Sequence, residues 1–561
     1  MSQINFLSVG LLFLLACSSE SVQNTSPTFG GVFFSNEEAI SPLFQNEFSS
    51  VNLKELSEGW VYLGSDSIAG ISRDLPDFGV GSKLELPHRI DLPNHSLWYT
   101  NTVDLDAGYL QVKADDGAQV WLDGALVIRE SGGDLFPVGN VKAGQLTIRC
   151  VNNAMAGGLQ KVSWISENDL EDWQAASLRE FDSFLLVRKI DLLDDEALRS
   201  EVKEMSASER KIRMDSYPIL MTDPVVIASA DGEYFVRWVS ERGGYATLIL
   251  EDGSEQMLKS EDGVFTLDLG ERDSVQFQLS QDKSQLGTYS FSKPKVNNKV
   301  KLAIWADSQG GWDTFHQISK MLKTHQPDVS IGAGDLVNNG SDLYAFPRLL
   351  QKLSLMSTPQ LLVPGNHDYD GYYEDLEPKL LQKYVQRPED LSYGMMRIGA
   401  AAILSLDPNR TFPVGINSNS EQGKWLDATM KSVEWKSASW KIVVLHQPPY
   451  SQGWPGYTGE QRIRELLEPY LQLGLVNVVI AGHTHDYERL QLSFSGHKVE
   501  FLIVGGAGGG LEPVGKDSVF PQMDRLIKKH HFGILELDSE NLNLQVFGLD
   551  GDLLDDYNVQ R

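Results

Sequence analysis

Residues 361–368 read LLVPGNHD, an apolar run that stops at a turn bearing Asn366 and His367. The run has the length of one buried strand, and Pro364-Gly365 marks the turn that ends it. In α/β sheets, ligand sites collect at the carboxyl ends of the strands. This stretch therefore predicts a strand of an α/β domain that carries functional side chains to the rim of its sheet.

Four more apolar runs end on the same kinds of side chain, and apolar residues recur at helical spacing between several of them. The five runs and the polar residues after them are 302–306 with Asp307 and Gln309, 329–333 with Asp335, 361–363 with Asn366 and His367, 442–445 with His446, and 478–482 with His483 and His485. This alternation predicts an α/β domain in which five strand ends form one site.

The residue types at these strand ends favour a metal centre. Asp, Asn and His together suit Mn, Fe or Zn better than an all-oxygen calcium site. Two metal ions ~3.5–4 Å apart need a ligand that bridges them, which a carboxylate can do. A single Asp or His at a strand end is usually a cap or a core residue, but five coincident clusters favour a catalytic metal site.

The motifs occur in the order found in calcineurin-like metallophosphoesterases. They are ADSQ (306–309), GDLVNNG (334–340), PGNHDYD (364–370), VVLHQPPYS (443–451) and GHTHDYER (482–489). HQPPYS, GHTHDYER and the glycine-rich VGGAGGG (504–510) most resemble purple acid phosphatases. The resemblance covers residues 298–561 and implies an α/β domain of two sheets in four layers, with a dinuclear centre of two divalent metal ions.

The resemblance also implies a role for each site residue. Asp307 and His485 would bind the first metal, with Gln309 as a further candidate ligand, and Asp335 would bridge. The second metal would be bound by Asn366, His446 and His483. His367 would stand beside the substrate as a general acid or as a stabiliser of the phosphate charge, and Asp307 and His367 would be the catalytic residues.

Two positions depart from the family pattern. Gln309 stands where most of the superfamily has His, so the first metal either gains a neutral amide oxygen or loses a ligand. Asn338 stands where purple acid phosphatases have the tyrosine that binds ferric iron. Without that phenolate, we expect divalent metals and no purple colour.

Other residues near the motifs are interpreted as supporting structure. Tyr487, Glu488 and Arg489 are expected to position the site, with a direct phosphate contact by Arg489 as the alternative. The run 504–510 lacks the Lys-Ser/Thr ending of a phosphate-binding loop, so it predicts a tight turn near the site. His530-His531 is interpreted as a surface pair, although it could also reach the pocket.

The upstream half predicts two all-β sandwich domains joined by helices. Residues 30–166 alternate apolar and polar residues, with Asp123-Gly124 as a hairpin signal. The segments at 98–105, 112–127 and 143–158 resemble galactose-binding-like jelly rolls, which either bind carbohydrate or only pack against a neighbour. Residues 167–214 predict a helical connector. The short strands of 215–297 resemble the fibronectin-type-III-like domain that precedes purple acid phosphatases.

The start of the chain predicts export. Residues 1–17 form an apolar signal too short to cross a bilayer, and Leu14-Leu15-Ala16-Cys17 resembles a bacterial lipobox. That resemblance implies lipidation of Cys17, a polar tether over 18–29 and anchoring to the bacterial cell envelope, at the outer membrane. No Lys or Arg precedes the apolar run, so a periplasmic or secreted protein with an ordinary cleaved signal, or a buried N-terminal segment, is the alternative.

Composition limits the partners. The 561 residues carry a net charge of −29, which repels phosphate backbones and argues against binding to nucleic-acid duplexes. Metal ions can reverse the sign inside one pocket, so a phosphate-ester substrate remains compatible. The sequence therefore predicts a metal-dependent phosphomonoesterase. The alternatives are a phosphodiesterase or nucleotide hydrolase on the same site, or a carbohydrate-binding lipoprotein with an inactive phosphoesterase domain.

Overall fold

The computed structural model describes residues 52–67, 72, 74–93, 95–114, 117–129, 135–152, 156–296, 298–369, 378–411, 413–454, 456–511 and 522–561. The predicted signal and tether, with Cys17, lie outside the described residues. Within them, no helix combines the length and the apolar character needed to cross a bilayer.

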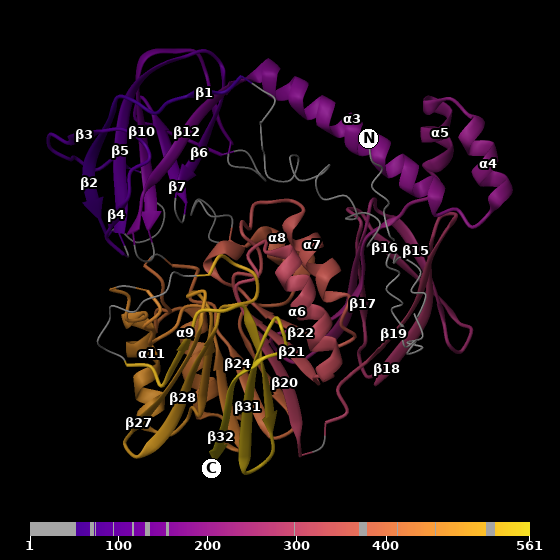
Figure 1. Ribbon diagram of the computed structural model, residues 1–561, viewed down its shortest axis with the longest axis vertical. Coiled ribbons are helices and arrows are strands. Elements are labelled where there is room, and N and C mark those ends of the chain that lie inside the picture. The colour runs from indigo at the N-terminus through magenta and orange to yellow at the C-terminus, as the bar shows by residue number, and fades with distance from the viewer. Residues whose placement is uncertain are drawn as a thin grey trace, which may run out of the picture.

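The C-terminal half is built on two sheets that face each other (Figure 1). The order of the nine-stranded sheet is β17-β14-β13-β22-β21-β20-β30-β31-β32, and that of the seven-stranded sheet is β23-β24-β25-β26-β28-β27-β29. One apolar cluster, which includes Leu302, Ile331, Ile442 and Ile480, takes residues from both sheets. Because the central strands are buried on both faces, they are mainly apolar and do not alternate regularly between apolar and polar residues.

Helices cover the outer face of each sheet. Phe315 of α6 (Trp312–His325) and Leu349 of α7 (Ala345–Leu353) pack on the nine-stranded sheet, together with α8 (Lys379–Val385). Leu426 of α9 (Glu421–Lys431) and Leu467 of α11 (Gln461–Gln472) pack on the other, beside α10 (Val433–Lys436). The domain therefore has two sheets inside and helices outside, as the resemblance implied.

The strands of this half have the following bounds. They are β20 (Val300–Trp305), β21 (Val329–Ala333), β22 (Gln360–Val363), β23 (Gly394–Ile398), β24 (Ala401–Ser405), β25 (Trp440–Val444), β26 (Val478–Ala481), β27 (Tyr487–Phe494), β28 (His497–Val504), β29 (Arg525–Ile527), β30 (His531–Leu537), β31 (Asn541–Gly548) and β32 (Leu553–Gln560). A short 3-10 turn, η1 (Asn366–Asp368), follows β22.

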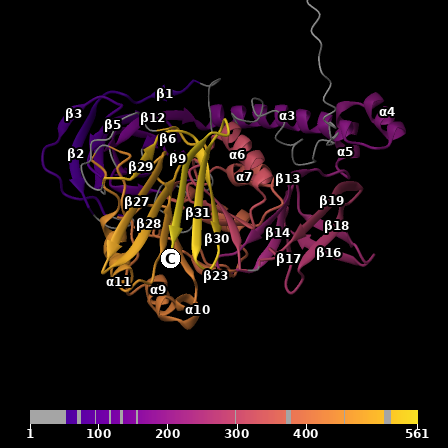
Figure 2. The ribbon, with the colours of Figure 1, turned by 60° about the horizontal axis from the view of Figure 1, so that its bottom comes forward.

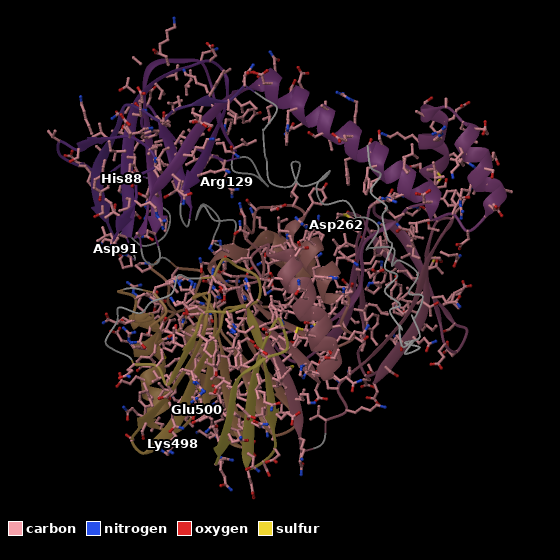
Figure 3. All side chains as sticks on the ribbon, viewed as in Figure 1. His88, Asp91, Arg129, Asp262, Lys498 and Glu500 are labelled. Carbon is pink, nitrogen blue, oxygen red and sulfur yellow. The ribbon has the colours of Figure 1, made fainter. Side chains whose placement is uncertain are left out.

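The carboxyl ends of the central strands of both sheets point the same way. β32 runs down to the C-terminus in Figure 1. β30 runs parallel to β32, because both pair antiparallel with β31. β20 pairs antiparallel with β30, so β20 runs upward. In Figure 3, Lys498 lies below Glu500, so β28 and its parallel neighbour β26 also run upward. These ends face the N-terminal strands, on which Asp91 is labelled in Figure 3.

Strands from the predicted 215–297 segment are not confined to a separate unit. β13 (Leu220–Ala228), β14 (Tyr234–Ser240) and β17 (Val264–Asp268) belong to the nine-stranded sheet, because Ile227 and Ala228 of β13 pair in parallel with β22. Four more strands form a second layer, in which Phe277 packs against Trp238 of β14: β15 (Gly244–Leu250), β16 (Glu255–Ser260), β18 (Ser274–Gln281) and β19 (Ser284–Ser292). The predicted boundary at residue 298 thus divides a continuous sheet.

The N-terminal strands form two packed sheets. The first has the order β1-β12-β6-β9, the second β3-β2-β5-β10-β7-β8, and β11 pairs with β4. Asp123 and Gly124 have φ of 50° and 80° and connect paired β7 and β8, which confirms the predicted hairpin. The bounds are β1 (Lys54–Glu55), β2 (Trp60–Asp66), β3 (Ser82–Leu84), β4 (Ile90–Asp91), β5 (His95–Leu105), β6 (Gly108–Ala114), β7 (Ala118–Leu122), β8 (Ala125–Val127), β9 (Leu135–Val138), β10 (Val141–Asn152), β11 (Ala156–Gly157) and β12 (Leu159–Ser166).

Three helices join the two halves. The long α3 (Glu167–Asp191) begins at the Ser166 cap, and both views show it running from the N-terminal strands to α4 (Glu196–Glu204) and α5 (Ala207–Met214) (Figure 2). Trp173 near one end and Phe181 farther along are buried, whereas residues 174–180 are exposed or half-buried. Helix α3 therefore spans the distance between two packed regions.

The shared sheet makes a testable prediction about the minimal folded unit. Val225, Ile227 and Phe235 lie in the core beneath α6 and α7. Each such side chain contributes about 1.5–3 kcal/mol when buried, against the ~5–15 kcal/mol that stabilises a typical domain. We expect a fragment of residues 298–561 to unfold at a clearly lower temperature than a fragment of residues 215–561. Calorimetry of both fragments tests this, and equal melting temperatures would contradict it.

Candidate metal centre

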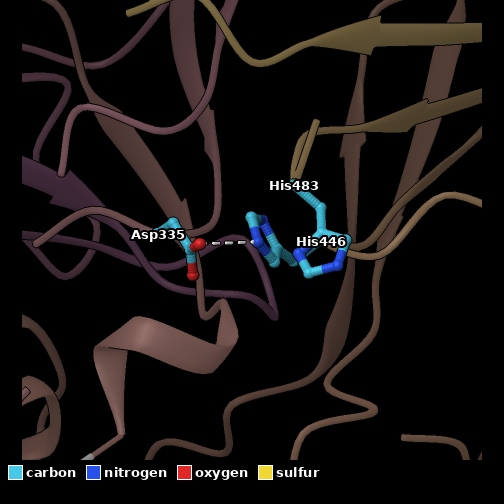
Figure 4. A group of neighbouring side chains, drawn as sticks. All are labelled: Asp335, His446 and His483. Carbon is cyan, nitrogen blue, oxygen red and sulfur yellow. Dashed lines mark ion pairs between the residues drawn. The ribbon is translucent and has the colours of Figure 1, made fainter. Parts of the chain in front are cut away.

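The predicted ligands converge at the strand ends. Single ligand atoms of Asp335, His446 and His483 all lie within 4.8 Å of one another, and all three residues are buried (Figure 4). Asp335 follows β21, His446 follows β25 and His483 follows β26, so the two sheets contribute to one cluster. The packing of the sheets against each other therefore creates this site.

Asp335 lies between the other site residues. Its Oδ1 accepts a hydrogen bond from the backbone N–H of His367 at 2.9 Å, and its Oδ2 accepts one from Nε2 of Gln309 at 2.8 Å. Nε2 of His446 lies 3.0 Å from Oδ2 but is not aligned for a hydrogen bond. The carboxylate therefore has neighbours on both sides, as a bridging ligand requires.

Asp307 lies deeper, beside the GHTH turn. Both of its carboxylate oxygens accept from the backbone N–H of His483, at 3.1 and 2.9 Å. Nε2 of His485 is 3.5 Å from Asp307 Oδ1, and Nε2 of His446 is 3.9 Å from it. Asp307 and His485 thus form a pair on the first-metal side that the resemblance implies.

Three histidines are oriented in the same way. Nδ1 of His446 bonds to the carbonyl of Ala333 at 2.9 Å, Nδ1 of His485 to that of Gly510 at 2.6 Å, and Nδ1 of His367 to that of Asn338 at 2.9 Å. A carbonyl only accepts, so each Nδ1 carries the proton. The Nε2 atoms are then the ones available to the site, which is how metal-ligating histidines are usually held.

The electrostatics of the cluster suit a cation. Burial, with the neighbouring His446, lowers the pKa of His483 well below its ordinary value, so its ring is neutral. The buried His483 Nε2 has no hydrogen-bond partner among the described residues. Burial raises the pKa of Asp307 well above its ordinary value, whereas His446 and His367 outweigh burial at Asp335 and lower its pKa. Two buried carboxylates beside a neutral imidazole are a donor set that a metal ion would stabilise.

Backbone strain is concentrated at the site. Asp307, Gln309, Asp335 and His483 have φ of 59°, 36°, 49° and 77°. Non-glycine residues in this region cost of order 1–3 kcal/mol each and persist where the surrounding structure enforces them. Here the strained turns direct four neighbouring side chains of the predicted site from the ends of adjacent strands.

Two motif glycines are required by close approach. A Cβ on Gly365 would lie 2.2 Å from Oδ1 of Asp335, and one on Gly482 would lie 2.3 Å from Oδ2 of Asp307. Any side chain at these positions would displace a carboxylate of the site. The glycines of PGNHD and GHTH are therefore explained by contact with the acids of the other motifs.

The glycine-rich run 504–510 forms the predicted turn near the site. The backbone N–H of Gly509 bonds to the carbonyl of Asp307 at 2.7 Å, and that of Ala507 to the carbonyl of Ala306 at 3.0 Å. The interpretation of His530-His531 as a surface pair is wrong for His531. This residue is fully buried, with its N–H bonded to the carbonyl of Gly506, because it begins strand β30 beneath the run.

Tyr487, Glu488 and Arg489 support the site from behind. Tyr487 and Arg489 both bond to Oδ2 of Asp555 at 2.8 Å, and the Arg489 guanidinium stacks on Tyr557. Glu488 is buried and accepts from the hydroxyl of Ser451 and from the backbone of 452–453. These contacts agree with a supporting role, and the phosphate contact proposed for Arg489 gains no support.

An amide network supports Asn366, and it was not predicted from the sequence. Nε2 of Gln447 donates to Oδ1 of Asn366 at 3.1 Å and to Oδ1 of Asn409 at 2.6 Å, and Asn409 donates to the carbonyl of Pro364. The position of Gln447 directly after His446 could have identified it as a site residue. No sequence feature points to Asn409, because it lies in the loop after β24, far from every motif.

Comparisons with known proteins agree with the motif order. Residues 300–487 match the family model described as calcineurin-like phosphoesterase. Purple acid phosphatase 21 of Arabidopsis thaliana is 28% identical over 220 residues, 36% of this chain and 48% of the relative. Probable purple acid phosphatase 20 of the same plant is 28% identical over 276 residues, 45% and 62% respectively. The chain spans about half the length of the curated relatives it matches.

A solved structure shows a similar match. The purple acid phosphatase PPD1 from yellow lupin (Lupinus luteus) seeds aligns with a TM-score of 0.47 and 16% identity, over 60% of this chain and 74% of that one. The family match confirms a calcineurin-like metallophosphoesterase domain in the C-terminal half. The resemblances suggested for residues 30–166 and 215–297, and the lipobox, stay predictions.

The position of Asp335 predicts a large effect on metal content. Asp335→Asn replaces the carboxylate between the two predicted metal positions with a neutral amide, so the variant should bind less metal than the wild type. Metal analysis of the purified protein measures this. A matched control is Asp223→Asn, because Asp223 is a buried carboxylate of β13 bonded to Gln351 and Tyr289, away from the site. The control should retain metal; equal metal in Asp335→Asn and wild type would remove Asp335 from the bridging role.

Proposed function

We propose that this protein hydrolyses phosphate esters, chiefly monoesters, at a centre of two divalent metal ions. The observation that carries the proposal is the buried cluster of Asp335, His446 and His483, in which a neutral imidazole nitrogen faces an ionised carboxylate. Asp307, Asn366 and His485 would complete the ligand set. The family match and the purple acid phosphatase relatives support the same reaction class.

The donor set favours Mn, Fe(II) or Zn. Bound ions of this kind hold the phosphate and lower the pKa of water, which supplies the nucleophile. Asn338, at the position of the ferric-binding tyrosine, has an exposed side chain and no phenolate. A ferric ion therefore lacks its usual ligand, and we propose that the ions are divalent and the protein colourless.

His367 is suited to meet the substrate. Its side chain is 32% exposed, compared with 14% for His485 and none for His446. Its Nδ1 is held by the carbonyl of Asn338, and its Nε2 lies 4.0 Å from Asp335 Oδ2. A protonated His367 can therefore present Nε2–H to an oxygen of the ester, as a proton donor or as a stabiliser of charge.

A second candidate reaction, hydrolysis of a nucleotide or of an aryl phosphate ester, is favoured by one observation. The rings of Trp454 and Tyr457 lie 5.0 and 5.8 Å from that of His483, with Trp454 only half-buried. Aromatic side chains beside a phosphate site favour a substrate that carries a planar ring. Carbohydrate binding by the N-terminal sheets and lipid anchoring through Cys17 are further proposals that rest on sequence alone.

The first experiment tests the reaction itself. Protein stripped of metal should be inactive on nitrophenyl phosphate and should recover activity when Mn, Zn or Fe(II) is added alone. The recovered enzyme should show no charge-transfer band in the visible spectrum. No release of nitrophenol with any of the three ions, despite bound metal, would contradict the proposed function.

The second experiment assigns His367. General acid catalysis is typically worth ~10²–10⁴-fold, but a nitrophenyl leaving group departs as an anion and needs little help. We therefore expect His367→Ala to slow an alkyl phosphate by about that factor and nitrophenyl phosphate far less, with bound metal unchanged. Equal loss on both substrates would make His367 a charge stabiliser, and loss of metal would make it a ligand.

A further inference from the structure

The two metal positions of the proposed centre have unequal numbers of protein ligands. In the dinuclear centre proposed above, Asn366, His446 and His483 would accompany the shared carboxylate of Asp335 at one metal position. At the other, the ligands beside Asp335 would be Asp307 and His485, whose Nε2 lies 3.5 Å from Oδ1 of Asp307. The two positions that could supply a further ligand to this poorer half are Gln309 and Asn338.

Gln309 is held as a hydrogen-bond donor. Its Nε2 donates to Asp335 Oδ2 at 2.8 Å, and its backbone N–H donates to the carbonyl of Asp335 at 3.2 Å. Its Oε1 is directed to the glycine-rich run, 3.1 Å from where a Cβ of Gly509 would stand. An amide N–H has no lone pair to offer a cation, so in this orientation Gln309 is not a ligand.

The opposite orientation of the amide is unfavourable. Rotating it would bring Oε1 against Oδ2 of Asp335, two acceptors with no proton between them. The donor orientation also occupies one lone pair of Asp335 Oδ2, which weakens that oxygen as a ligand. With Gln in place of His, the metal position at Asp307 and His485 has one ligand fewer, and the Gln309 amide competes with the metal ions for Oδ2 of Asp335.

Asn338 does not compensate. Its side chain is exposed, and its backbone carbonyl is already bonded to Nδ1 of His367. Metal sites with three protein ligands keep an open position, whereas four ligands close the shell of an ion such as zinc. The poorer half therefore offers at most three protein ligands and the richer half four.

We infer that the two metal positions fill in order, with the ion at Asp335, Asn366, His446 and His483 held tightly and the ion at Asp307 and His485 exchangeable. The inference rests on the dinuclear centre proposed above. The isolated protein is then a one-metal form that becomes active only when free divalent metal rises. Gln309 sets this threshold, because a ligand at its position would fix the second ion permanently.

Metal titration of the full chain tests the inference without using activity. Stripped wild-type protein, titrated with Zn²⁺ in a calorimeter, should show two sites whose affinities differ by about 100-fold, the scale on which a single site residue changes metal affinity. After gel filtration, metal analysis should find one ion per chain. Gln309→His should retain two ions, and Gln309→Ala should retain one, like the wild type.

Control variants identify the sites. Gln461→His adds a histidine on the exposed surface of α11 and should still retain one ion. Asp307→Asn and His485→Ala should keep the tight ion, whereas His483→Ala should lose it. Two ions of equal affinity in the wild type, or no gain from Gln309→His, would overturn the inference. Loss of a retained ion in Gln309→Ala would also overturn it, by showing that the amide oxygen is a ligand.

The outcomes for the inference and for the proposed function are separable. Sequential metal binding without ester hydrolysis would leave the inference standing and reject the function. Hydrolysis with two equally tight ions would do the reverse. If both hold, the rate of hydrolysis should follow occupancy of the weak site and not of the tight one.

Discussion

The cost of burying two carboxylates side by side governs this structure. Asp307 and Asp335 are almost inaccessible to solvent, and each is surrounded by donors drawn from a different motif. Unpaired buried charge is expensive, so the arrangement needs cationic or N–H partners from every side. The backbone N–H groups of His367 and His483 and the side-chain amide of Gln309 provide these partners. Each comes from a different strand end, so the acids can be stabilised only when both sheets are in place.

The same constraint explains the local backbone. The backbone at residues 365 and 482 lies so close to the carboxylates of Asp335 and Asp307 that only glycine fits there. The residues at which the chain turns into the site have left-handed φ. In the glycine-rich run 504–510, the backbone N–H of Gly509 bonds to the carbonyl of Asp307, so the run packs against the Asp307 side of the site. Nδ1 of His367, His446 and His485 is fixed by backbone carbonyls, so the orientation of each ring is set by the fold and does not depend on the metal.

The rest of the molecule is arranged around the face that carries this cluster. The strand ends face the N-terminal sheets, and α3 sets how far those sheets stand from them (Figure 1). β13, β14 and β17 extend the nine-stranded sheet on the opposite side from β30, β31 and β32. The upstream strands are therefore part of the framework that holds the site, as well as a connection to the N-terminal sheets.

The sequence by itself predicted which residues gather at the candidate site, because each motif is local. An apolar run followed by Asp335, or by Asn366 and His367, can be recognised within ten residues of sequence. The hairpin signal at Asp123-Gly124 consists of only two residues. The donor role of Gln309, the support of Asn366 by Asn409 and the burial of His531 were decided by the tertiary structure. So was the pairing of β13 with β22, which joins strands from either side of residue 298 in one sheet. Each depends on contacts between segments separated by tens or hundreds of residues, and neither hydrophobic period nor local propensity carries information about such pairings.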